Sequence, residues 1–85
     1  PTPLLKLAPN PASAWLAMDY RLETPADRAY LLLRDATGRQ LEQIPIAHTE
    51  GQAVYDTRPL APGPYTVELV NGGQLMDAQK LIVRP

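Results

Sequence analysis

Residues 60–69 read LAPGPYTVEL, and this stretch decides the fold class. Gly63 stands between two prolines and two residues before Tyr65, where an alternating apolar pattern begins. In β-sandwiches, a tyrosine at the start of a late strand reaches back to the backbone a few residues upstream and fixes the crossover between sheets. We therefore predict a structural corner in which Gly63 permits the turn, Tyr65 anchors it and Leu60 packs into the core. A binding loop is the weaker interpretation, because recognition of proline-rich segments needs an extended exposed run and this one breaks at Gly63.

Alternation of apolar and polar residues, which indicates strands with one buried face, recurs along the chain. In residues 14–22 it places Leu16, Met18, Tyr20 and Leu22 on the predicted core face. The other predicted strands are residues 4–7, 28–35, 41–46, 52–57, 65–70 and 79–83. Each is short and is followed by a segment that contains glycine, proline or asparagine.

Two of these segments predict tight turns between strands. DATGR at residues 35–39 has an aspartate to start the turn and Gly38 for a positive φ, and NGG at residues 71–73 is a strong turn sequence. Pro45 lacks a backbone donor, so we expect its strand at the edge of a sheet or at a break. Together these patterns predict an all-β fold, a small immunoglobulin-like β-sandwich of about seven mostly antiparallel strands.

Composition limits the classes of function. The chain has 85 residues, enough for one small domain, and a formal net charge of −1 with its charges scattered singly. This pattern offers no basic face for nucleic acid and no polybasic patch for a membrane surface. The chain has no cysteine, which excludes disulfides, thiolate nucleophiles and cysteine metal sites. Because it begins with Pro1, we expect it to be a piece of a longer protein.

The chain also lacks the residue groups that catalysis needs. His48 is the only histidine and Ser13 the only serine, and nothing in their spacing predicts that they meet beside a carboxylate. We expect His48 to lie in a solvated loop. The nine carboxylates never adopt the spacing of a calcium loop, and no phosphate-binding loop is present. The sequence therefore predicts no enzyme activity, no metal and no cofactor.

Trp15 is the best candidate for a ligand platform, because an exposed tryptophan on a sheet can stack on a sugar ring. A single aromatic residue is a weak signal, and packing in the core or at its rim is the favoured interpretation. The alternative function that it supports is an accessory carbohydrate-binding or adhesive β-sandwich module of a secreted protein.

Four segments in a fixed order carry a resemblance to a known family. They are LAPNPAS at residues 7–13, DATGR at residues 35–39, LAPGPYTV at residues 60–67 and KLIV at residues 80–83. In this order and spacing the chain resembles the C-terminal sorting domain of proteins that Bacteroidetes-type bacteria export by the type IX secretion system. The resemblance covers residues 5–85. Two positions depart from the family pattern: Ala8 replaces an aromatic or larger apolar residue, and Pro85 replaces a basic one.

The resemblance implies a function without chemistry of its own. Members are immunoglobulin-like sandwiches at the C-terminus of larger cargo proteins, which they direct through the outer-membrane translocon to the cell surface or the medium. The implied partners are the translocon, a surface sortase and the upstream cargo. The implied signal residues are Pro9, Asn10, Pro11, Lys80, Leu81, Ile82 and Val83.

A physical interpretation of these signal residues accompanies the resemblance. We expect Pro9, Asn10 and Pro11 to form a stiff entrance between a linker at residues 1–4 and a sorting domain at residues 5–85, with the Asn10 side chain bonded to nearby backbone. Residues 80–83 have a strong strand pattern. They either lie in the sandwich as its last strand or offer an edge to a partner, including a second copy of the chain, by strand addition.

Overall fold

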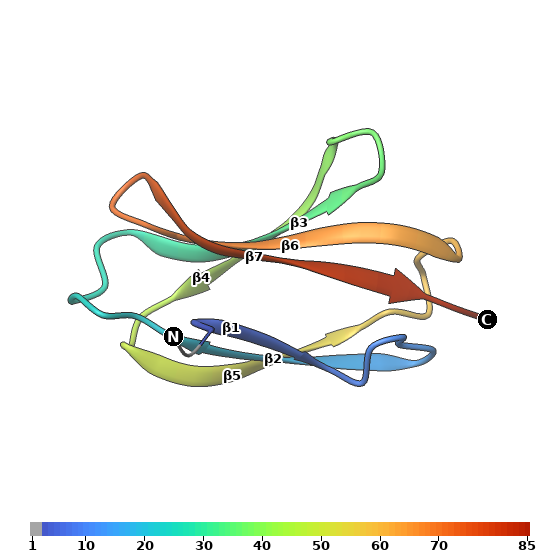
Figure 1. The fold of residues 1–85 in the computed structure, drawn as a ribbon, viewed down its shortest axis with the longest axis horizontal. Helices are drawn as coiled ribbons and strands as arrows, with labels where there is room; N and C mark the ends of the chain where they lie inside the picture. Colours follow the sequence, from blue (N-terminus) through green and yellow to red (C-terminus); the bar gives the residue numbers. More distant parts are fainter. Residues whose placement is uncertain (1–2) are drawn as a thin grey trace.

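The alternating segments form seven β-strands in two antiparallel sheets that pack face to face (Figure 1). This computed structural model describes residues 3–85, and none of these residues belongs to a helix able to cross a membrane. One sheet has the strand order β1-β2-β5 and the other the order β4-β3-β6-β7. The strands are β1 (Leu5–Ala8), β2 (Trp15–Arg21), β3 (Ala29–Asp35), β4 (Gln40–Ile46), β5 (Glu50–Asp56), β6 (Gly63–Asn71) and β7 (Gln74–Val83). The prediction of a small all-β sandwich is confirmed.

The core lies between the two sheets and consists almost entirely of aliphatic side chains. Its largest fully buried apolar members are Leu5, Leu16, Leu31, Leu69, Leu81 and Val67. On β2 the predicted core face is confirmed: Leu16, Met18 and the adjoining Leu22 are buried, and Tyr20 is half-buried against the cluster. β5 contributes only partly buried side chains, those of Ala53 and Tyr55. β5 is therefore the strand that contributes least to the core.

Both predicted hairpin turns form. In the turn between β3 and β4, the Asp35 carboxylate accepts hydrogen bonds from the backbone amides of Thr37 and Arg39, and Gly38 has a φ of +88°. Between β6 and β7, Gly72 and Gly73 have φ values of +60° and +75°, as a two-residue hairpin loop requires. This tight loop lets pairing resume at once, with Asn71 opposite Gln74. For that reason β7 begins five residues before the predicted start at residue 79.

Asn71 has a role that the turn pattern did not predict. Its side chain is 6% exposed and bonds the connection between β2 and β3. The Oδ1 atom accepts a hydrogen bond from the Asp27 amide at 2.7 Å, and Nδ2 donates to the Pro25 carbonyl and the Thr24 hydroxyl, each at 3.1 Å. A buried amide with all these partners satisfied fixes this connection onto the end of β6.

A carboxylate closes one side of the sandwich. Asp77 on β7 accepts hydrogen bonds from the backbone amides of Leu4 and Leu5 at 3.0 and 2.9 Å. Leu4 also packs against the core, and its carbonyl accepts a hydrogen bond from the Arg21 amide. The structure thus places Leu4, which was predicted both as the end of the linker and as the start of a strand, with the folded domain. Two other residues of that predicted linker, Pro1 and Thr2, lie outside the described residues.

Candidate recognition site

The four sequence segments that carry the family resemblance meet at one end of the sandwich, which we call the motif end. Within it, residues 63–66 of β6 pair with residues 80–83 of β7, with Gly63 opposite Val83 and Tyr65 opposite Leu81. Asp35, at the start of the β3–β4 turn, lies opposite Tyr65 on the other side of β6. The connection between β1 and β2 lies along the free side of β7 near the chain's C-terminus (Figure 1). Segments up to 72 residues apart therefore form one surface.

Asn10 joins the first segment to the last. Its Nδ2 atom donates to the Lys80 carbonyl at 2.7 Å, and its Oδ1 atom accepts from the Ile82 amide at 3.0 Å. Ala12, fully buried, continues the contact: its amide donates to the Ile82 carbonyl, and its carbonyl accepts from the Arg84 amide. The Asn10 side chain and the parallel bridge between Ala12 and Val83 thus occupy the edge of β7 where another strand could otherwise pair.

Two details of the sequence interpretation differ from this geometry. Pro9, Asn10 and Pro11 follow β1 and connect it to β2, so they lie inside the domain and not at its entrance. The reason is that β1 pairs along β2 before the prolines are reached. Asn10 bonds backbone far away in the chain, whereas nearby backbone was expected. The peptide bonds that precede Pro9 and Pro11 are both cis.

Residues 80–83 occupy the sandwich, and their outer edge is covered. Leu81 and Val83 are buried core residues, while Lys80 is exposed and Ile82 half-buried. Asn10 and Ala12 bond the Ile82 amide and carbonyl, the groups that a partner strand would have to pair with. The alternative in which this segment offers its edge for strand addition is therefore blocked at Ile82.

The corner at residues 60–65 has the geometry that the sequence indicates. The Tyr65 hydroxyl donates to the Ala61 carbonyl, and the Tyr65 ring is buried. Gly63 has a φ of +142°, a value that favours glycine, and the partly buried Leu60 packs against the core. The corner lies beside residues 80–83 because β6 starts there.

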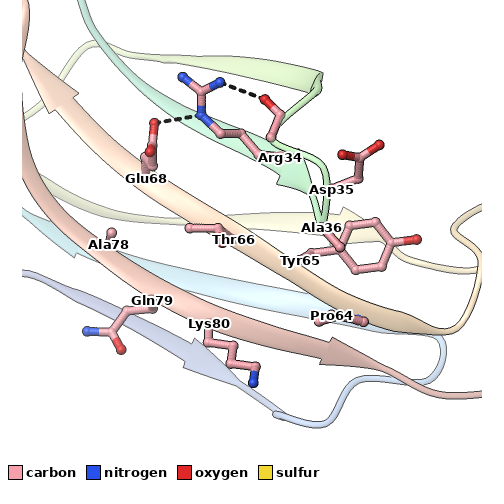
Figure 2. A pocket seen from close by; sticks show the side chains of 11 residues that line it. Arg34, Asp35, Ala36, Pro64, Tyr65, Thr66, Glu68, Ala78, Gln79 and Lys80 are labelled. Carbon is pink, nitrogen blue, oxygen red and sulfur yellow. Dashed lines mark hydrogen bonds and ion pairs between the residues drawn. The ribbon is translucent and has the colours of Figure 1, made fainter.

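A shallow hollow lies on the outer face of the four-stranded sheet at the motif end (Figure 2). Arg34 spans it, with Nε donating to Glu68 at 3.1 Å and Nη1 donating to the Gly38 carbonyl at 2.9 Å. These bonds hold the β3–β4 turn beside the sheet. Tyr65 and Lys80 line the same hollow, so it combines apolar surface with charges of both signs. Such a surface suits contact with another polypeptide.

The charged groups near this end are solvated and structural. The Thr37 hydroxyl donates to Asp35 at 2.6 Å and is the main cause that lowers the pKa of this carboxyl. The Arg58 side chain donates two hydrogen bonds to the Asp56 carboxylate and its backbone amide donates a third, and together they lower the pKa of Asp56 to about 2. Among residues 3–85 no group of three or more potential metal ligands is found.

The remaining candidates from the sequence lie apart. Ser13 precedes β2 and His48 follows β4, and both are exposed at opposite ends of β2. Trp15 is 53% exposed on the outer face of the three-stranded sheet, so the favoured interpretation, packing in the core or at its rim, is wrong. Its neighbour Leu16 takes the inward position, and strand alternation turns Trp15 outward. Trp15 and Val54 line a second hollow with Asp56 and Arg58.

The structure is thus a small two-sheet sandwich that gathers its sequence motifs at one end. The family model described as the secretion system C-terminal sorting domain matches residues 6–84 of the chain. The chain therefore belongs to this family, the C-terminal sorting domains of type IX secretion, a family of sorting signals and not of catalysts. Membership implies export across the outer membrane to the cell surface or the medium. None of the curated proteins compared matches the chain.

Proposed function

We propose that this domain directs an attached cargo protein through the type IX translocon, and that the translocon contacts the motif end. The observation that carries the proposal is the hydrogen-bonded contact of Asn10 with Lys80 and Ile82, which makes one surface of the first and last family segments. The partners are the translocon, a sortase and the upstream cargo. The domain supplies a shape to be recognised and performs no step of chemistry.

The signal residues divide into two groups by burial, which supports a recognition role. Leu81 and Val83 are buried, and their packing in the core holds the surface residues in place. Pro9, Pro11 and Lys80 are exposed around them, although the fold does not need their side chains in its core. Exposed residues in a family motif are available to a partner.

The position of the N-terminal strand favours the same function. Leu5 pairs with Tyr20, at the end of β2 that is remote from the motif end. A cargo attached ahead of β1 would therefore join the sandwich at its far end. The motif end would stay accessible while the cargo is attached.

The test is export of a periplasmic reporter that carries these residues at its C-terminus, in a host with a type IX system. Lys80→Glu should abolish or strongly reduce export, because it reverses a charge on the exposed motif end. Lys6→Glu is the matched control, since Lys6 is the only other lysine and lies exposed on β1. Unfolding midpoints of both variants should equal that of the parent chain. Full export of Lys80→Glu, or of a chain that lacks residues 80–85, would contradict the proposal.

The exposure of Trp15 favours a second candidate function, carbohydrate binding. Trp15 is 53% exposed beside the Asp56–Arg58 ion pair, an arrangement in which a sugar ring stacks on the indole while its hydroxyls bond the charged pair. A glycan panel tests it: binding should occur and should disappear in Trp15→Ala. A flat result across the panel would remove this candidate without affecting the export test.

A further inference from the structure

Three of the four sheet edges in this sandwich are protected against pairing with another strand. Pro45 in β4 has no backbone donor. On β7, Asn10 and Ala12 occupy the backbone groups around Ile82. The β1 strand has only four residues, and the outward amide of Leu5 is bonded to Asp77. Natural β-proteins protect edges in these ways because an open edge is a template for strand addition.

The fourth edge, β5, is open. Its seven residues contain no proline, and every side chain is exposed or half-buried. At one end of the β2–β5 ladder the Leu22 amide donates to the Thr49 carbonyl, and at the other end the Thr57 amide donates to the Ala14 carbonyl. The odd-numbered residues of the β5 segment therefore direct their backbone amides and carbonyls toward β2. By the alternation of an antiparallel ladder, the amides and carbonyls of Glu50, Gln52, Val54 and Asp56 point away from the sheet. Among residues 3–85, no hydrogen bond outside the β2–β5 ladder involves the backbone of these four residues.

We propose that β5 pairs antiparallel with β5 of a second copy of the chain, with Val54 on the two-fold axis. In such a pair, only the even-numbered residues of β5, whose backbone groups point outward, can form the hydrogen-bonded pairs with the other copy. This condition leaves few possible registers. With Val54 opposite Val54, Gln52 lies opposite Asp56, and Glu50 lies opposite residue 58 in the turn that follows β5. The register thus brings together two apolar side chains and an amide with a carboxylate, and it places no like charges opposite each other.

The neighbouring registers are less complementary. Centring the pair on Ala53 puts Glu50 opposite Asp56, and like charges directly opposite each other oppose strand pairing. Centring it on Gln52 puts Glu50 opposite Val54, and centring it on Tyr55 puts Val54 opposite Asp56, so both registers leave the apolar side chain against a charge. Charge and hydrophobicity therefore select the register centred on Val54.

The inference extends beyond the proposed sorting function and does not depend on it. Val54 is the most exposed of the large apolar residues, at 65%, and its neighbour Trp15 is 53% exposed on the same face. Pairing at β5 would reduce this apolar exposure and create one continuous sheet of six strands from two copies of the order β1-β2-β5. Because the two β5 strands run antiparallel, the two motif ends point away from each other and stay uncovered.

Cysteine cross-linking tests the register directly, because the chain has no cysteine of its own. In a hydrogen-bonded antiparallel pair the two α-carbons are about 5.5 Å apart, within the range that a disulfide bridges. We expect Val54→Cys to form a disulfide-linked dimer under mild oxidation at least about tenfold faster than Gln52→Cys, whose two copies lie about 14 Å apart in this register. Equal rates for the two variants would overturn the register.

Sedimentation of the cysteine-free chain over a concentration series tests the dimer itself. The parent chain should associate reversibly below about 1 mM, and Val54→Lys should be monomeric because it places two like charges on the axis. Leu75→Lys is the matched control, an exposed apolar residue on β7 whose substitution should leave association unchanged. A parent chain that remains monomeric at this concentration, or equal effects of the two lysine variants, would overturn the proposal.

Discussion

The Ile82 amide donates a hydrogen bond to the Asn10 side chain at 3.0 Å, across 72 residues of sequence. The same side chain donates to the Lys80 carbonyl, so one amide group satisfies two backbone groups on the edge of β7. This contact converts two short family segments into a single surface. It also explains why the last strand is not free to pair with a partner around Ile82.

Asn10→Ala should weaken both the fold and export. The variant loses two hydrogen bonds to β7, and we expect the free energy of unfolding to fall by about 1–2 kcal/mol. Urea denaturation measures this loss, and the reporter fusion measures export. Asn10→Asp, which keeps the acceptor for Ile82 and loses the donor for Lys80, should be intermediate in stability. Unchanged stability in Asn10→Ala would show that the contact does not stabilise the domain in solution.

Tyr65→Phe tests the corner. The hydroxyl donates to the Ala61 carbonyl at 2.5 Å, and its removal leaves the ring packing in place. We expect a loss of about 1 kcal/mol in the free energy of unfolding. Tyr30→Phe is the control, because the Tyr30 hydroxyl has no hydrogen-bond partner within the described part of the chain. Equal effects of the two substitutions would argue against a corner bond.

Asn71→Ala should be the most damaging of the polar substitutions. Because Asn71 is buried, the variant leaves the Asp27 amide and the Pro25 carbonyl without their partner. The expected loss is about 2–3 kcal/mol, with faster hydrogen exchange at the Asp27 amide. The replacement Asn71→Asp keeps the acceptor for Asp27 and should slow that exchange again. Exchange at Asp27 that matches the parent chain in Asn71→Ala would refute the assignment.

Thr57→Val should stabilise the domain. Thr57 is fully buried and its hydroxyl has no hydrogen-bond partner among residues 3–85, so the polar group is desolvated without compensation. Valine has nearly the same shape, and we expect a gain of about 1 kcal/mol, or about 4–8 °C in Tm. Thr66→Val on β6, where the side chain is only half-buried, should change Tm much less. A lower Tm in Thr57→Val would show that the hydroxyl has a partner in solution.

Acid should release the Asp56–Arg58 contact at low pH. Arg58 lowers the pKa of Asp56 from 3.8 to about 2, so the folded state binds this proton less readily than the unfolded chain. The stabilisation from Asp56 is therefore fully present above pH 3.8 and is lost as the pH falls through about 2. Carboxyl chemical shifts followed by NMR measure the titration, and Arg58→Gln should return the Asp56 midpoint toward its ordinary value. A midpoint near 3.8 in the parent chain would contradict the ion pair.

Local patterns in the sequence were sufficient for most of the fold. The strand of Leu16 and Met18 follows from alternation, because successive side chains in extended backbone point to opposite faces. The turns at Gly38 and at Gly72 follow from the few residues that accept a positive φ. Each of these inferences involves residues within a few positions of each other. The start of β7 was the exception, because the alternation in residues 74–78 was too weak to extend the strand to the turn.

The same reasoning could name residues of the candidate site but could not predict how they contact each other. The resemblance named Asn10 and Lys80 among the signal residues, yet nothing local predicts that their segments touch. Trp15 shows a similar limit: its size suggested burial, and only the packing of the two sheets shows that the outer face of β2, on which Trp15 lies, stays exposed.

The sequence by itself determined the strands, the turns and the fold class, since alternation, φ preferences and missing donors act between neighbours in the chain. The tertiary structure alone decided that Asn10 bonds β7, that Asp77 holds the amides of Leu4 and Leu5, and that Asn71 fixes the β2–β3 connection. These contacts join residues 44 to 73 positions apart. Their partners are set by strand order and register, which arise when two sheets close over a shared core, and no short window of sequence contains that information.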